Sequence, residues 1–251
     1  MSPVVPIRGR VPQPRPYPAP EPTPYDGGWA VVDLEASGSS SRRHRVVELA
    51  VVLLDRDLEP QGEFTTLVDP QGPVGPTHIH GIEPAHLAGA PRFGGIAGRL
   101  LGLLRGRVLV GHNVGCDRSF LVAEYARVGL RLPVVPELCT MRMATRYGEP
   151  GGTSYGLSLR ACAAAIGVTG WRPHTALEDA RATAALLAHY APRAAGLDRL
   201  LTAAAAVRWP EPAELSGLSG ADALWTARPA WAAPGNDSAP RSVPDVRNGL
   251  A

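Results

Sequence analysis

Short apolar runs alternate with amphipathic segments through the middle of the chain. Four runs predict strands that are wholly or partly buried: 28–35, 46–55, 107–110 and, more weakly, 63–68. Apolar residues at helical spacing predict helices over 93–104, 118–128, 157–166, 175–190 and about 198–207. Because the strands come first and then alternate with helices, the pattern predicts an α/β fold in which helices flank a mixed central sheet.

The two ends of the chain differ in composition from this middle part. Every second residue from Pro12 to Pro24 is proline, which lacks the amide donor that helices and sheets need. We expect a Pro-rich disordered leader over 1–27, or alternatively a ligand for an aromatic-lined groove. We expect one folded domain over 28–192, a C-terminal helix over 193–209 and a flexible tail over 210–251. Trp209 and the two tryptophans of the tail, Trp225 and Trp231, either pack back on the domain or bind a partner.

Charge and cysteine content narrow the class of protein. The formal net charge of +2 neither indicates nor excludes a nucleic-acid binder. Three cysteines without a C-x-x-C spacing exclude a disulfide scaffold and a cysteine-based zinc knuckle, and they fit a reducing compartment. No segment resembles a signal peptide or reaches the length of a membrane span, so we expect a cytoplasmic protein without membrane contact.

The strand 28–35 ends in two acids, Asp33 and Glu35. Alternation along a strand places both side chains on one face, where two carboxylates repel each other unless a cation lies between them. Oxygen ligands of this kind suit Mg²⁺ or Mn²⁺. Alone the pattern is weak, because many strands end in acids that face water. Asp117, which follows the strand 107–110, is either a third ligand or the N-cap of the next helix.

The segment from Thr175 to Glu178 fits a capping box that starts a helix. His174 and Asp179 then occupy positions that pack together at a helix entry, which brings an imidazole and a carboxylate to one place. Separately, each residue is explained as a surface histidine or as a charge that favours the helix dipole. Each of these separate structural explanations is plausible alone, but all of them would have to hold at once. A single functional site that uses these acids and His174 together explains the pattern better.

Four segments resemble motifs of the DnaQ-like 3′→5′ exonucleases of the DEDDh class, over about residues 29–190. They are V-V-D-L-E-A-S-G at 31–38, H-I-H-G-I at 78–82, G-H-N-V-G-C-D at 111–117 and H-T-A-L-E-D-A at 174–180. The resemblance implies an RNase H-like fold. It further implies that two divalent metal ions, Mg²⁺ or Mn²⁺, bind to Asp33, Glu35, Asp117 and Asp179, and that His174 is the general base.

The same resemblance assigns a substrate-binding set: Ser37, Gly38, Ile79 and His80 cradle the terminal nucleotide, while His112 and Asn113 shape the site. The chain departs from the family pattern at two places. Where the family often has two threonines after the glutamate, this chain has Ala36 and Ser37, so Ala36 lacks a hydroxyl, and Cys116 stands where an aromatic residue often precedes the motif aspartate. Contacts to the sugar or base at the 3′ end are therefore expected to differ from those of other members.

The implied reaction is hydrolysis of the last phosphodiester at a 3′ end, which releases a nucleoside 5′-monophosphate. The substrate is single-stranded DNA or RNA, with DNA in proofreading or repair favoured. An exoribonuclease, a non-catalytic polymerase or nucleic-acid binding module, and a phosphohydrolase of small esters are the alternatives. The tail is a candidate docking segment for a DNA polymerase subunit. The basic turn 42–45 either holds the nucleic-acid backbone or is a solvated hairpin tip.

Overall fold

The computed structural model of the chain describes residues 27–148 and 156–210. The strands in these residues are β1 (Gly28–Ala36), β2 (Val46–Leu54), β3 (Pro60–Leu67), β4 (Arg107–Gly111) and β5 (Glu137–Cys139). The helices are α1 (Thr77–His80), α2 (Phe93–Leu104), α3 (Val114–Arg127), α4 (Thr140–Tyr147), α5 (Leu159–Ala165), α6 (Ala176–Tyr190) and α7 (Leu197–Ala205). Short 3-10 turns lie at Pro84–Leu87 and Ala191–Arg193. Nearly all of the predicted leader and of the predicted tail lies outside the described residues.

The strands form a single mixed sheet in the order β3-β2-β1-β4-β5. β1, β2 and β3 pair antiparallel, whereas β4 runs parallel to β1 and β5 runs parallel to β4. All nine positions of β2 and the first five of β1 are buried, as expected for central strands that are covered on both faces. The prediction of a mixed central sheet is confirmed.

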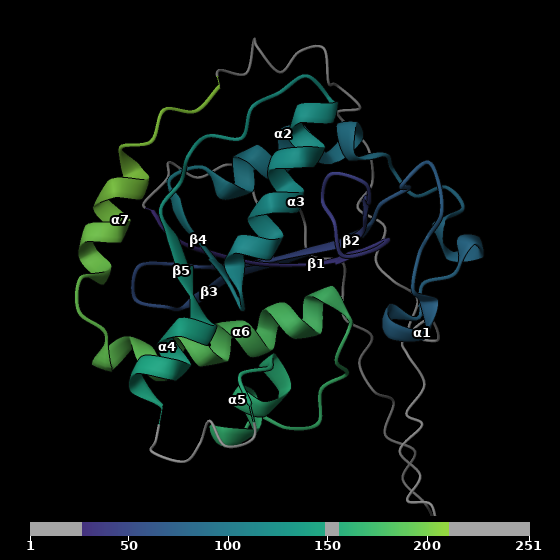
Figure 1. The fold of residues 1–251 in the computed structure, drawn as a ribbon. Coiled ribbons are helices and arrows are strands. Elements are labelled where there is room, and N and C mark those ends of the chain that lie inside the picture. Colours follow the sequence, from purple (N-terminus) through teal and green to yellow (C-terminus); the bar gives the residue numbers. More distant parts are fainter. Residues whose placement is uncertain (1–26, 149–155, 211–251) are drawn as a thin grey trace, which may run out of the picture.

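Helices cover both faces of this sheet (Figure 1). α2 and α3 lie on one face, and α4, α5 and α6 lie on the other. Successive residues of β1 alternate between the two layers: Ala30 and Val32 pack with α2 and α3, whereas Trp29 and Val31 pack with α6. Continued alternation therefore directs Asp33 and Glu35 to the α6 side of the sheet.

Helix α3 begins earlier than the sequence pattern predicts. It starts at Val114 instead of Arg118, because Asn113 takes a left-handed conformation (φ 71°) and serves as the N-cap residue. Val114, Gly115 and Cys116 are weak helix formers, so propensity gives no signal for this first turn. Asp117 consequently lies inside the first turn, and its interpretation as the N-cap is wrong.

Three of the labelled elements were not predicted at all. α1 has four residues and β5 has three, too few for a clear periodicity, and α4 follows β5 directly with eight residues. The other predicted helices are confirmed with ends that shift by one or two residues. None of the helices that the structure describes is long and apolar enough to span a membrane.

The chain beyond α7 returns to the sheet. Trp209 packs against the α2 side of the core, and the guanidinium of Arg105 donates to the carbonyl of Pro210 at 2.6 Å. For Trp209, packing on the domain is thus confirmed, while Trp225 and Trp231 lie outside the described residues.

Candidate active site

The end of β1 supplies the first two acids. Burial along β1 falls from buried to half-buried at Asp33, where the strand leaves the apolar core. The pairing with β2 continues through Asp33 opposite Ala50 and Glu35 opposite Glu48, and it becomes irregular directly after Glu35. Both carboxylates therefore sit on the last regular positions of the central strand, and the predicted placement on one strand is confirmed.

The start of α6 supplies His174 and Asp179. The backbone N–H of His174, a residue with φ 63°, donates to Oδ2 of Asp179 at 2.8 Å. The indole Nε1–H of Trp171 donates to Oδ1 of the same carboxylate at 2.8 Å. Because each oxygen of Asp179 accepts a hydrogen bond, its side chain is held in one orientation.

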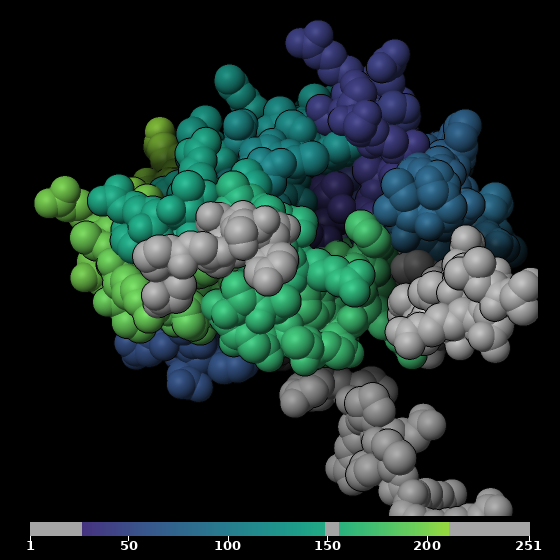
Figure 2. All heavy atoms as spheres, turned by 60° about the horizontal axis from the view of Figure 1, so that its bottom comes forward, coloured from purple at the N-terminus to yellow at the C-terminus, as the bar shows by residue number. Residues whose placement is uncertain are grey.

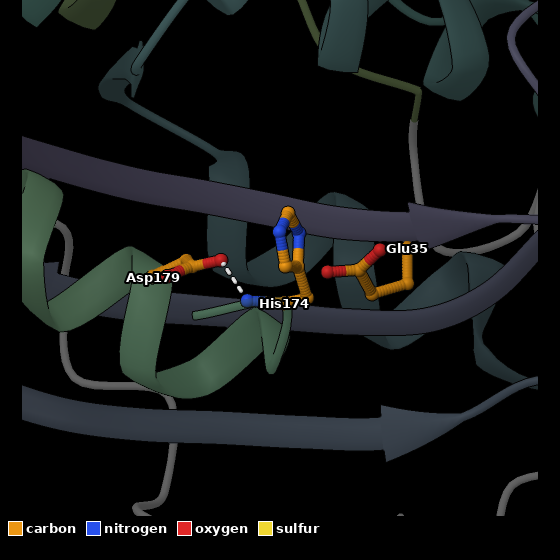
Figure 3. Close-up of side chains that lie close together, drawn as sticks. All are labelled: Glu35, His174 and Asp179. Atoms are coloured by element: carbon orange, nitrogen blue, oxygen red, sulfur yellow. Dashed lines mark hydrogen bonds between the residues drawn. The ribbon is translucent and has the colours of Figure 1, made fainter. Parts of the chain in front are cut away.

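The end of β1 and the start of α6 lie close together. Glu35, His174 and Asp179 each offer one ligand atom, and the three atoms lie within 4.8 Å of one another. Figure 3 shows the imidazole of His174 between the two carboxylates, with Asp179 on α6 and Glu35 on β1. The predicted approach of His174 to Asp179 is confirmed. Asp33 and Asp117 lie outside this group of three but act on it or on each other through their charges.

Asp117 reaches the site from α3 and is only 7% exposed. Gly111 at the end of β4 makes room for it, because a Cβ atom there would lie 3.1 Å from Oδ2 of Asp117. Burial raises the pKa of Asp117 to about 7, although hydrogen bonds from backbone groups of Asp117 and Leu34 act in the opposite direction.

The other acids share this unfavourable concentration of negative charge. Burial raises the pKa of Asp33 well above its ordinary value, and the charges of Asp117, Asp179, Glu35 and Glu48 raise it further. Burial also raises the pKa of Asp179, against the hydrogen bonds from Trp171 and His174. Such a cluster is relieved by a cation, and its carboxylate oxygens are the donors that a hard divalent ion prefers. The residues present therefore fit a divalent metal site.

The capping box predicted for α6 is not formed. Thr175 occupies the N-cap position, but its side chain makes no capping hydrogen bond. Glu178 instead pairs with Arg181 at 2.5 Å. The N–H of Ala176 is bound by Oε2 of Glu48 at 3.1 Å, so an acid from β2 caps the helix.

Sequence reasoning missed Glu48 and Trp171. The signal for Glu48 was a single acid inside the apolar run 46–55, which is anomalous for a buried strand. Trp171 gave no comparable signal, since its partner Asp179 lies eight residues further along the chain in a different element.

The segment from Gly75 to Ile82 lies against the end of β1. A Cβ atom on Gly75 would lie 2.3 Å from the carbonyl oxygen of Ser37, so the two backbones touch. Ile79 is 40% exposed, whereas His80 is 1% exposed and its Nδ1 accepts a hydrogen bond from the N–H of Ile82 at 3.0 Å. Of this pair, Ile79 presents its side chain to solvent, whereas His80 is buried and stabilises the turn between them and Ile82.

Figure 2 shows a hollow next to this segment. Its floor is purple, from the N-terminal strands, and its walls are the blue segment around residues 70–90 and the green region of α5 and α6. The predicted substrate residues Ser37 and Gly38 follow β1 at this end of the sheet. Gly38 packs on the ring of His44, since a Cβ atom would lie 2.6 Å from it.

His112 connects the end of β4 to the layer around α6. Its Nδ1 is 3.0 Å from Oγ1 of Thr140, and its Nε2 is 2.8 Å from the carbonyl oxygen of Leu157. Burial lowers the pKa of His112, which keeps the ring neutral near pH 7. Both ring nitrogens are thus engaged within the protein, and Asn113 beside it is the N-cap of α3. This geometry suits residues that shape the site.

The basic turn between β1 and β2 has one arginine that is anchored to the fold, Arg45, and two that are exposed, Arg42 and Arg43. Arg45 forms a bidentate pair with Glu124 of α3, at 2.8 and 2.9 Å, and Glu124 is 1% exposed. Arg127 donates to the carbonyls of Ser41, Arg42 and His44. Arg42 and Arg43 are exposed. The turn is therefore a fixed loop that presents these two guanidinium groups to solvent.

Comparison with known proteins places this arrangement in a family. A Mycobacterium tuberculosis protein named for a bifunctional exonuclease/endonuclease is 32% identical over 63% of this chain and 26% of its own length. A PolC-type DNA polymerase III of Clostridium perfringens is 30% identical over 65% of this chain and 11% of its own length. The DNA polymerase III subunit epsilon of Aquifex aeolicus is 33% identical over 63% of this chain and 78% of its own length. The chain thus spans about a quarter or less of the first two relatives.

Solved structures confirm the predicted RNase H-like exonuclease fold. Escherichia coli exonuclease I superimposes with a TM-score of 0.57 at 18% identity, over 66% of this chain and 42% of that one. The family model described as "Exonuclease" matches residues 30–187, which include most of β1, the start of α3 and the start of α6. Because this match covers more than half of the sequence, the chain belongs to the exonuclease family.

Proposed function

We propose that the chain is a metal-dependent 3′→5′ exonuclease that hydrolyses nucleic-acid ends to nucleoside 5′-monophosphates. The observation that carries the proposal is the convergence of Glu35, His174 and Asp179 within 4.8 Å, together with the half-buried Asp33 and the buried Asp117, whose charges act on one another. Membership of the exonuclease family supports it. An intact set of five such groups argues against a non-catalytic binding module, since a module without catalysis has no need to hold mutually repelling carboxylates.

The acids Asp33, Glu35, Asp117 and Asp179 would hold two divalent ions, Mg²⁺ or Mn²⁺. When bound, such ions supply charge neutralisation at the scissile phosphate and an acidified water. His174 is exposed, beside both carboxylates, and in its neutral form takes the proton of the attacking water. Trp171 and the N–H of His174 orient Asp179, so the acid is placed before substrate binds.

Binding of the terminal nucleotide is assigned to the hollow beside β1. Ser37 and Gly38 follow β1, with the backbone of Ser37 against Gly75, and the exposed side chain of Ile79 offers an apolar surface to a base or sugar. The buried His80 stabilises the turn that carries Ile79, whereas His112 and the exposed Asn113 shape the neighbouring end of β4. The site accepts a single-stranded 3′ end.

DNA is the substrate class that we propose. The relatives include DNA polymerase III subunit epsilon and PolC-type DNA polymerase III, at 30–33% identity. Escherichia coli exonuclease I has been solved in complex with a dT13 oligonucleotide. RNA is the second candidate, because a 3′-exonuclease described as recognising the 3′ end of a histone mRNA stem-loop has the same fold, with a TM-score of 0.57.

The test is a gel time course on two 5′-labelled single strands of matched sequence, one DNA and one RNA, with Mg²⁺, Mn²⁺ or a chelator. Glu35→Gln and Asp179→Asn are expected to remove activity, whereas Asp57→Asn, an exposed acid at the β2–β3 turn, leaves it unchanged. A metal-dependent ladder that shortens from the 3′ end supports the proposal, and the faster strand assigns the substrate. A folded, metal-supplemented protein that degrades neither strand would overturn it.

A further inference from the structure

Glu48 is an acid in the middle of a buried strand. It is 0% exposed, and it is the only charged residue among the nine positions of β2. Burial of a carboxylate costs several kcal/mol unless it is bound by donors. An acid at this position therefore needs a role that offsets the cost.

Its contact with α6 indicates the role. Oε2 of Glu48 accepts a hydrogen bond at 3.1 Å from the N–H of Ala176, 128 residues away in sequence. Ala176 is the first residue of α6, and first-turn N–H groups have no partner inside their own helix. A carboxylate is the acceptor that a helix N-terminus favours most, because the dipole adds to the hydrogen bond. Because the side chain of Thr175 forms no capping hydrogen bond, Glu48 of β2 supplies the side-chain acceptor for this N–H.

The position of Glu48 in the sheet connects the two halves of the site. In the ladder it lies directly opposite Glu35 of β1. The helix start that it binds carries His174 on one side and Asp179 in the first turn. One side chain therefore fixes the distance between the acid of β1 and the pair on α6.

We propose that Glu48 is a positioning residue of the exonuclease site, which caps α6 and so places His174 and Asp179 against Glu35. It acts through the N-terminus of α6 and does not touch substrate. The catalytic consequence rests on the proposed exonuclease function, whereas the anchoring of α6 does not.

Two substitutions separate the parts of this role. Glu48→Gln keeps an oxygen that accepts from Ala176, and Glu48→Met keeps the volume without an acceptor. Tyr125→Phe is the matched control, because it removes one buried hydrogen bond, from Tyr125 to the carbonyl of Ala97 at 3.0 Å, on the opposite side of the sheet. All three are expected to fold and to lower the melting temperature.

Three readouts are measured on each purified full-length variant. Hydrogen exchange of the amides 176–179 in metal-free protein should accelerate about 10-fold or more in Glu48→Met and only about 2–3-fold in Glu48→Gln, since loss of a buried partner costs more than weakening it. The midpoint of Mn²⁺ binding and kcat should worsen about 10–100-fold in Glu48→Met, as for other supporting residues around metal ligands, and less than about 5-fold in Glu48→Gln. Tyr125→Phe should leave all three unchanged.

Each contrary result is informative. Unchanged exchange over 176–179 in Glu48→Met overturns the anchoring. Equal loss of Mn²⁺ affinity in Glu48→Gln and Glu48→Met also overturns the proposal, because it identifies the charge of Glu48 as a ligand for the metal. Exchange and Mn²⁺ binding do not require nuclease activity, so an inactive wild-type protein would count against the proposed function alone. If Glu48→Met fails to fold, Glu48→Gln alone tests the anchoring: faster exchange of the amides 176–179 supports it, and unchanged exchange overturns it.

Discussion

Trp171 holds one oxygen of Asp179 through its indole N–H, and this bond lowers the pKa of a carboxyl that burial raises. Trp171→Phe removes the donor and keeps most of the ring. We expect the pKa of Asp179 to rise further and kcat to fall about 10-fold near pH 7, the lower end of the range for such supporting bonds. Since Asp179 must be ionised to bind metal, the acid limb of the pH–rate profile should move to higher pH.

Steady-state rates between about pH 5 and 9 at saturating Mn²⁺ check this prediction. Trp209→Phe is the matched control, because Trp209 packs on the α2 side of the core, away from the acids. An acid limb that stays in place while kcat falls would show that Trp171 contributes by packing alone.

At the scale of elements, the anchored turn between β1 and β2 separates arginines by role. Arg45 neutralises Glu124, which is 1% exposed and also accepts from the N–H of Val46. Removing one partner of a buried ion pair leaves the other charge uncompensated, at a cost of about 3–5 kcal/mol. We expect Arg45→Ala to lower the free energy of unfolding by about 3 kcal/mol, the lower end, because Arg127 also contacts Glu124. Urea unfolding of the wild type and the variant measures this loss of stability, as a lower midpoint with an unchanged m-value.

If the turn between β1 and β2 contacts nucleic acid, Arg42 and Arg43 are the side chains that bind phosphates of the substrate strand. The double variant Arg42→Ala/Arg43→Ala removes two exposed charges and should leave stability unchanged within about 0.5 kcal/mol. Each phosphate contact on a single strand contributes about 0.7 to the salt dependence, so the slope of log K against log salt should fall by roughly 1.4. Binding of a labelled single strand at several salt concentrations, in a chelator, checks this. An unchanged slope identifies the turn as a solvated hairpin tip.

The elements also show how far the sequence could lead. Alternation was sufficient for Asp33 and Glu35, because a strand has period two whatever surrounds it. Helix-entry geometry was sufficient for His174 and Asp179, which are five residues apart. Glu48 could not be assigned a partner, since its contact spans 128 residues and depends on how α6 packs on β2. The early start of α3 likewise depends on the left-handed Asn113; asparagine favours that conformation more than most residues do, but it also occupies many others, so the sequence does not fix the helix start there.

At the scale of the whole molecule, the acid cluster opposes folding when no metal is bound. The pKa of Asp117 is raised to about 7, above its ordinary value near 4, mainly by burial. Between these two values the folded chain binds a proton that the unfolded chain has released. Stability of the metal-free protein therefore falls as pH rises from about 4 through about 7.

Asp117→Asn removes this penalty and tests the whole argument. In a chelator at pH 8 we expect the variant to be more stable than the wild type by about 1–2 kcal/mol, and this difference should shrink below pH 7, where Asp117 of the wild type is protonated. Mn²⁺ should raise the melting temperature of the wild type at pH 8 but that of Asp117→Asn much less, because ligands stabilise only the state that binds them. Thermal melts of both proteins and of Asp57→Asn, from pH 5 to 8, give the answer. A wild-type melting temperature that rises with pH in the chelator would contradict the charged cluster and, with it, the physical argument for the proposed metal site.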